Sequence, residues 1–155
     1  MKRPHVQIHS VLHSAAILEK QLEHLLGPTK IRHRQALVLD ALQKVGPSSQ
    51  QHLAKHFSVS PGTMSSMISR LEALGYIERA TNPTDRRADV VKVTSIGVAA
   101  LTGVAEVWQS GDKIIENILG PEDSQQLFAL AEKLSLTLGG GPPKKEGDDT
   151  SPAPE

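Results

Sequence analysis

Residues 52–97 read HLAKHFSVSPGTMSSMISRLEALGYIERATNPTDRRADVVKVTSIG, and the spacing of the apolar residues changes within this stretch. The first part predicts two helices, over 50–57 and 60–74, joined by a tight link. Ser60 is a residue type favoured just before a first helical turn, and Pro61 follows it in the preferred order. Two short helices with so short a link predict a helix-turn-helix.

The second part of this stretch has the features of paired strands. Residues 76–80 and 90–93 are β-branched or aromatic runs, and the turn-rich segment 81–85 lies between them. This arrangement predicts a β-hairpin with a loop longer than two residues. A hairpin that directly follows a helix-turn-helix predicts a winged helix.

Outside this unit the pattern is helical. Apolar residues at three- and four-residue spacing predict helices over 6–26, 31–45, 94–119 and 122–138. Gly-Pro pairs at 27–28, 46–47 and 120–121 end three of these segments. Thr94 or Ser95 is expected to cap the long fifth helix, in which Gly103 and Gly111 are expected soft points.

The predicted fold is mainly α: a winged helix-turn-helix with a two-stranded β wing and a helical dimerisation layer from the N- and C-terminal helices. The apolar stripes of 6–26 and 122–138 are wider than one winged helix can cover, which favours a homodimer. We expect residues 1–30 and 94–138 to form the dimerisation region and 31–93 the winged helix-turn-helix domain. The Gly-, Pro- and charge-rich tail 139–155 is expected to be disordered.

Composition limits the class of protein. The 155 residues have a formal net charge of zero and no cysteine, which excludes disulfides, thiolate metal sites and thiol redox sensing. The first 93 residues carry 13 basic and 7 acidic side chains, whereas the rest carry 4 and 10. Such asymmetry indicates that the first part faces a polyanion. The chain has no membrane-length apolar run and no signal peptide, so we expect a soluble cytoplasmic protein with no membrane partner.

No enzyme motif is present. The sequence contains no glycine-rich phosphate loop, no G-x-S-x-G, no H-E-x-x-H and no nucleophilic cysteine, and no cofactor is expected. The four aromatic residues, Phe57, Tyr76, Trp108 and Phe128, are too few for stacking on single-stranded nucleic acid. Double-stranded DNA is therefore the expected polyanion.

The second helix of the helix-turn-helix supplies the first candidate contacts. With its Met, Ile and Leu residues turned inward, the outward face is expected to present Thr63, Ser65, Ser66, Ser69 and Arg70. A major groove admits such a helix, and the N-terminal half of the helix reaches base edges. The alternative is a polar face without a binding role.

This sequence resembles the MarR family of bacterial winged-helix transcriptional regulators. The resemblance is carried by RLEALGYIER at 70–79 and TDRRADVVKVTSIG at 84–97, with weaker similarity at 34–42 and 52–71. It implies a homodimer whose two winged helices read a palindromic duplex, most often to repress transcription. Arg32, where members often have a cap threonine, and Ser66, where a larger residue is frequent, depart from the family pattern.

Asp85, Arg86 and Arg87 lie at the expected tip of the wing. Long cations there can enter a narrow minor groove or bind phosphate. The resemblance implies that the aspartate of an Asp-x-Arg motif orients the wing arginine, a pair that corresponds here to Asp85 and Arg87. A solvated charge cluster is the alternative.

The resemblance also implies a small organic effector that binds between the dimerisation layer and the winged helix. Trp108, His13 and Ile17 are the candidate lining residues, although Trp108 alone could equally be a core tryptophan. Binding would release the protein from DNA.

Several histidines recur at i, i+4 spacing. His5, His9 and His13 are weak candidates for a metal site, because no carboxylate or cysteine completes a ligand set nearby. A regulator that responds to zinc or pH therefore stays open as one alternative. A second alternative is a winged helix that binds proteins and not DNA.

Overall fold

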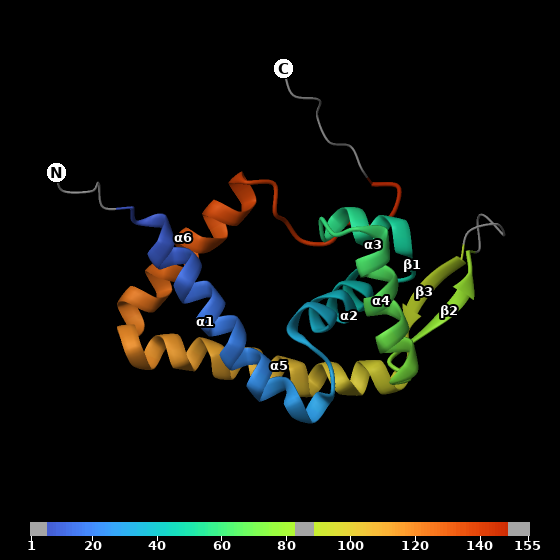
Figure 1. The fold of residues 1–155 in the computed structure, drawn as a ribbon, viewed down its shortest axis with the longest axis horizontal. Helices are drawn as coiled ribbons and strands as arrows, with labels where there is room; N and C mark the ends of the chain where they lie inside the picture. Colours follow the sequence, from blue (N-terminus) through green and yellow to red (C-terminus); the bar gives the residue numbers. More distant parts are fainter. Residues whose placement is uncertain (1–5, 83–88, 149–155) are drawn as a thin grey trace, which may run out of the picture.

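The computed structural model describes residues 6–82 and 89–148, and these form a mainly helical chain with one small antiparallel sheet (Figure 1). The elements in chain order are α1 (Ile8–Leu26), the 3₁₀-helix η1 (Gly27–Thr29), α2 (His33–Val45), β1 (Ser48–Ser49), α3 (Gln50–His56), α4 (Pro61–Ala73), β2 (Ile77–Thr81), β3 (Asp89–Val93), α5 (Ser95–Leu119) and α6 (Pro121–Thr137). The predicted mainly α winged helix-turn-helix is confirmed.

Three helices begin at side-chain caps. The Ser49 hydroxyl oxygen accepts from the His52 backbone N–H, and the Ser60 hydroxyl oxygen accepts from that of Thr63. Of the two residues expected to cap α5, Thr94 does so, accepting from the Gly97 N–H at 3.1 Å. Each cap satisfies a backbone donor that lacks a partner inside its helix.

The sheet has three strands, and not the two that the sequence predicted. Its order is β1-β3-β2, with Ser48 and Ser49 paired antiparallel to Val91 and Val90. A strand of two serines has no apolar alternation, so nothing in the pattern marked it. Ser48 is nevertheless only 1% exposed, because β1 closes the edge of the hairpin.

The second helix begins two residues later than predicted. Ile31 is buried, as its apolar character suggested, but it lies in an extended link between η1 and α2. Lys30 takes a left-handed conformation, with φ 62°, which directs the chain from η1 into that link. Arg32 stands at the N-cap, and its backbone N–H donates to Gln35 Oε1 at 3.0 Å. A guanidinium cannot accept a hydrogen bond, so the cap is supplied by Gln35.

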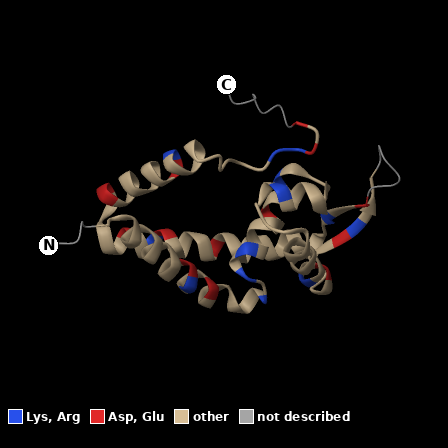
Figure 2. Ribbon diagram, turned by 45° about the horizontal axis from the view of Figure 1, so that its top comes forward, with Lys and Arg blue, Asp and Glu red and all other residues tan. Residues whose placement is uncertain are grey.

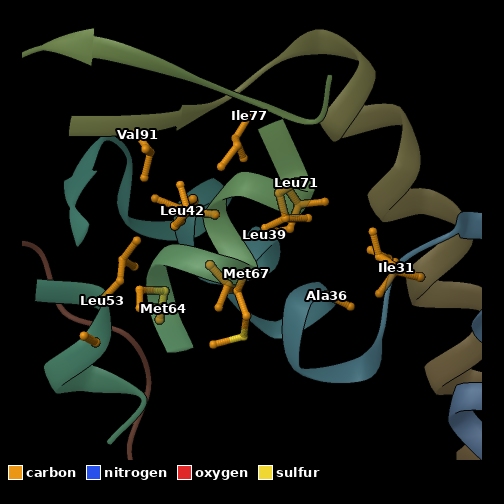
Figure 3. Packing of buried hydrophobic residues seen from close by; sticks show 14 of the residues in the cluster. Ile31, Ala36, Leu39, Leu42, Leu53, Met64, Met67, Leu71, Ile77 and Val91 are labelled. Atoms are coloured by element: carbon orange, nitrogen blue, oxygen red, sulfur yellow. The ribbon is translucent and has the colours of Figure 1, made fainter. Parts of the chain in front are cut away.

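The hydrophobic core lies inside the winged helix and is enclosed by α2, α3, α4 and the sheet (Figure 3). Leu39 and Leu42 of α2 pack with Leu71 of α4, and Ile77 and Val91 cover them from the sheet. The buried residues of α4 are those predicted: Met64, Met67, Ile68 and Leu71. This packing leaves the opposite side of α4 facing solvent.

Helix α5 connects this core to the two terminal helices. It packs against β3 and α2 in its first part and against α1 and α6 farther along (Figure 1). The expected soft points Gly103 and Gly111 lie within one continuous helix. Helices α1 and α6 bury only Leu26 and Ser124, respectively, so most of their surface is exposed. None of the helices in the described part of the chain combines the length and apolar character needed to span a bilayer.

The structure describes the first part of the tail, residues 139–148. These residues have no helix or strand, but they lie against α3 and hydrogen-bond to it through Lys144 and Glu146. Composition pointed to disorder, whereas these contacts use one carboxylate and one backbone carbonyl, which no apolar pattern reveals.

Candidate nucleic-acid interface

The exposed side of α4 carries the predicted contact residues. Thr63, Ser66, Ser69 and Arg70 are exposed, and Ser65 is half-buried. The Ser60 hydroxyl donates to Thr63 Oγ1 at 2.9 Å, so the first turn of α4 has its hydroxyl groups already oriented. Small hydroxyl side chains let the helix approach closely to a partner and can donate to phosphate or contact a thymine methyl.

Arg70 lies at the other end of this face. Its Nη2 donates to the Lys30 carbonyl oxygen at 3.3 Å, which holds the guanidinium against the link before α2. Thr63, Ser66 and Arg70, at three- and four-residue spacing, therefore share one side of α4, and Ser65 points to another side of the helix.

The wing residues Asp85, Arg86 and Arg87 lie outside the described residues. Side chains of α3 and α4 hold the hairpin strands that lead to these residues. Arg79 of β2 pairs with Glu72 of α4 at 3.4 Å and donates to Gln50 Oε1 of α3 at 3.3 Å. Exposed ion pairs of this kind add little to the free energy of unfolding. We assign these contacts the role of fixing the position of the hairpin relative to α3 and α4.

Helix α3 contributes a second polar surface beside α4. The structure places His52 and His56, both half-buried, on α3 and Ser49 at the start of that helix. Burial lowers the pKa of His56 below its ordinary value, and the neighbouring His52 lowers it further. His56 also stacks edge-on against Phe57, with ring centroids 4.8 Å apart. Sequence reasoning missed Ser49 and Arg79, because neither belongs to a periodic pattern.

Charge is distributed unevenly over the molecule (Figure 2). Lys55 on α3 and Lys144 and Lys145 after α6 lie on the same side as the helix-turn-helix. Acidic side chains outnumber basic ones along α1, α5 and α6. Basic side chains on the winged helix raise the local concentration of a polyanion there.

A cleft of about 440 Å³ opens between α1, α2 and α5. Trp108 lines it and also packs against the core, so both interpretations of this residue hold. The indole Nε1 donates to His33 Nδ1 at 3.4 Å, with the two rings edge to face. The other lining residues are mostly apolar: Leu18, Gln21, Leu22, Leu37, Asp40, Lys44, Gly111, Asp112, Ile114 and Ile115.

His13 and Ile17 do not line this cleft, so their assignment to it is wrong. Both are on the exposed side of α1, and Ile17 is 48% exposed. Leu18 and Leu22 take that place, because one residue along a helix turns the side chain by about 100°. The error therefore concerns the helix face and not the helix.

The histidines of α1 are not brought into a metal site. His5 lies outside the described residues, and His9 and His13 are exposed on α1. Within the described ranges, no three His, Cys, Asp or Glu side chains are grouped as a metal ion would require. The zinc alternative has no ligand set in that part of the chain.

Comparison with known proteins supports the interpretation of the fold. A sequence profile of the MarR family matches residues 29–88. The multiple antibiotic resistance protein MarR of Salmonella typhimurium is 36% identical over 81 residues, which are 52% of this chain and 56% of that protein. The match thus spans about half the length of such curated relatives.

Solved structures match over more of the chain. The apo form of MarR from Escherichia coli has a TM-score of 0.74 at 26% identity, covering 84% of this chain and 98% of that one. A mutant of the same E. coli protein in complex with operator DNA has a TM-score of 0.72 at 25% identity, covering 83% and 94%. Sequence profile, relatives and fold agree in showing that this chain is similar to proteins of the MarR family.

Proposed function

We propose that this protein is a transcriptional regulator, acting as a repressor, that binds palindromic double-stranded DNA as a homodimer in the bacterial cytoplasm. The observation that carries the proposal is the exposed hydroxyl-rich face of α4, held beside a braced hairpin whose tip sequence is Asp85-Arg86-Arg87. A protein of the same fold was solved with operator DNA. On this proposal residues 31–93 form the DNA-binding domain.

The DNA contacts follow from this arrangement. Thr63, Ser65, Ser66 and Ser69 would face the major groove, with Arg70 nearer the backbone, and Arg86 and Arg87 would bind the flanking minor groove or its phosphates, with Asp85 orienting Arg87. Dimer symmetry would place two such units on half-sites about one helical turn apart.

The homodimer is supported by the terminal helices. Exposed apolar side chains run along both, including Val11, Leu12, Leu127, Leu130 and Leu134. In Figure 1 α6 and the N-terminal part of α1 lie away from the winged helix. So large an exposed apolar surface marks an interface, and a symmetric second copy is the simplest cover. Residues 1–30 and 94–138 would form this dimerisation region.

Replacing Leu134 with aspartate should convert the dimer to monomer at micromolar concentration. Leu134 is 55% exposed on α6, and the symmetry of a dimer would bury two unpaired carboxylates at the interface. Sedimentation velocity measures the result. Gln125→Asp is the matched control, because nine residues along α6 place it on the opposite side of the helix. A wild-type protein that sediments as a monomer would contradict the dimer.

The cleft beside Trp108 supports regulation by a small organic effector. Its lining is mainly apolar with a few polar groups, as in ligand pockets generally, and it lies between α1, α5 and helix α2 of the winged helix. A ligand there can change DNA affinity only by binding one dimer geometry better than the other.

We expect an effector to change the fluorescence of Trp108, the only tryptophan, and to weaken duplex affinity over the same concentration range. The coupling should be about 5- to 150-fold. Small aromatic carboxylates such as benzoate are suitable first probes, measured by fluorescence and by duplex anisotropy. Leu18→Ala should weaken the response, whereas His13→Ala should leave it intact because His13 lies outside the cleft. Loss of the response in His13→Ala together with a zinc-dependent change in duplex binding would favour the metal alternative.

Selection of bound duplexes from a random pool tests the main proposal. Enrichment of a palindrome, bound with a steep dependence on salt, is the expected outcome. No enrichment and no salt-sensitive binding would instead favour the winged helix as a protein-binding module.

A further inference from the structure

The chain turns back sharply at the end of α6. The Gly140 N–H donates to the Ser135 carbonyl at 2.9 Å and the Gly139 N–H to that of Leu136 at 3.2 Å, with Gly139 at φ 90°. This is the Schellman pattern of a helix C-terminus. A Cβ on Gly140 would lie 2.5 Å from Ser135 Oγ and 3.0 Å from its carbonyl oxygen. The glycines therefore set the direction of the following residues.

Residues 139–148, which we call the strap, then cross to the winged helix, where Figure 1 shows them beside α3. Glu146 Oε2 accepts from the Ser49 backbone N–H at 2.9 Å, and Oε1 accepts from the Ser49 hydroxyl at 2.6 Å. His52 Nε2 donates to the Lys144 carbonyl at 2.9 Å. Hydrogen bonds to a carboxylate are stronger than those between neutral groups, so Glu146 is the main attachment point.

The strap covers a definite part of the surface. One hollow lies between Gly139–Lys144 and the outer face of α3 with its following turn, reaching Ser58. A second lies between Lys145–Gly147 and the loop end of the hairpin strands, at Asn82 and Val90. The strap thus extends from the turn of the helix-turn-helix to the strands that lead to the wing.

This is the surface that a duplex would need. In a helix-turn-helix the first helix crosses the DNA backbone, and serine hydroxyls and backbone N–H groups are common phosphate donors. Ser49 offers one donor of each kind at the start of α3, and a single carboxylate occupies both. Like a phosphate, that carboxylate presents two oxygens and a negative charge.

We propose that the strap is autoinhibitory: it occupies the backbone-binding surface of α3 and lies beside the loop end of the hairpin strands, with the Glu146 carboxylate on Ser49 where a DNA phosphate would bind. The inference rests on the proposed DNA binding. The duplex and the strap cannot bind Ser49 at the same time. Only protein with the strap undocked binds duplex, so the apparent duplex affinity falls in proportion to the undocked fraction.

The ionised form of Glu146 is favoured in this position. Partial burial acts to raise the pKa of its carboxyl group, but the two hydrogen bonds from Ser49 and the charge of His52 outweigh it, so the pKa lies below its ordinary value. Stabilisation of the docked strap is therefore present above the ordinary pKa of a glutamate and is lost as the pH falls through the lowered value. At neutral pH Glu146 is therefore in the ionised form that the two hydrogen bonds from Ser49 favour.

Glu146→Gln in the full chain tests the proposal, with Asp148→Asn as its matched control. Both remove one negative charge from the strap, but the Asp148 side chain makes no hydrogen bond or ion pair with the described residues. If at least one strap is docked in about 80% of dimers, Glu146→Gln should tighten duplex binding about fivefold. Asp148→Asn should change it by less than about twofold, the general charge effect. Ser49→Ala is unsuitable, because Ser49 also caps α3.

Limited trypsin digestion reports the strap itself. Cleavage after Lys144 and Lys145, followed by mass spectrometry, should be slow in the free wild type and faster in Glu146→Gln or with saturating duplex. Equal duplex affinities of the two variants, or slower cleavage in the presence of duplex, would overturn the inhibition while leaving DNA binding intact. If neither wild type nor Glu146→Gln binds duplex selected from a random pool, the DNA-binding proposal fails and the inhibition fails with it.

Discussion

Gly97→Ala should destabilise the protein by about 2–4 kcal/mol, although alanine is the better helix former by about 1 kcal/mol. Gly97 is buried in the first turn of α5, against the start of the hairpin. An added Cβ would lie 2.1 Å from the Tyr76 carbonyl oxygen and 2.8 Å from Val93 Cγ1. The first of these is backbone, so α5 and β2 would have to separate.

That separation has a further cost, because the Thr94 N–H donates to the same Tyr76 carbonyl at 3.0 Å. A buried carbonyl that loses its donor is unfavourable by about 1–3 kcal/mol. Thermal unfolding at fixed protomer concentration should show the melting temperature lowered by about 5–15 °C.

Gly103→Ala on the same helix is the control. Its added Cβ would meet nothing closer than Thr29 Cγ2 at 3.8 Å, an ordinary contact. Helix propensity alone should then stabilise the protein by up to about 1 kcal/mol. If the two alanine variants unfold at the same temperature, the close approach of α5 to Tyr76 is not a real constraint.

Elements with periodic apolar spacing and end signals could be predicted from the sequence. The buried positions of α4 follow the four-and-three spacing of Met64, Met67, Ile68 and Leu71, and Ser60-Pro61 marks the start of the helix. In both features the local preference and the tertiary packing agree, which is why a single sequence reveals them.

Features that depend on partners distant in the chain could not be predicted. Strand β1 exists because Ser48 and Ser49 lie beside Val90 and Val91, and a two-residue strand has no period of its own. The strap docks through a carboxylate and a carbonyl some 90 residues from their partners. Gly97 formed part of the family pattern, but only its distance to Tyr76 gives a physical reason for a glycine there.

The candidate DNA contacts lie between these two cases. The outward-facing residues of α4 could be predicted, because the apolar residues of the same helix mark its inward side. The hydrogen bond from Arg70 to the Lys30 carbonyl oxygen could not be predicted. In the cleft, Trp108 could be placed and the lining residues of α1 could not, since only the neighbouring helices select Leu18 over Ile17.

Ser66→Glu should reduce duplex affinity by about 100-fold or more without changing the fold. Ser66 is exposed on the N-terminal half of α4, so a glutamate there fits the free protein. In the complex, each of the two subunits would hold a carboxylate against DNA phosphates, and such like-charge contacts are unfavourable by several kcal/mol. Ser95→Glu, the same change on exposed α5, is the control and should bind normally.

The double variant Arg86→Ala, Arg87→Ala separates groove reading from backbone attraction, because it removes four cations from the dimer and adds no repulsion. The slope of log affinity against log salt decreases by about 0.9 for every phosphate that the protein no longer neutralises, so the slope should fall by as much as about 3–4. Ser66→Glu should weaken binding at all salt concentrations, and most of all to the selected palindrome. Anisotropy titrations at several salt concentrations, on selected and scrambled duplexes, measure the salt slope of the arginine variant and the affinity loss of Ser66→Glu. If the arginine variant keeps the wild-type slope, the wing does not bind phosphate and the duplex contacts lie on α3 and α4 alone.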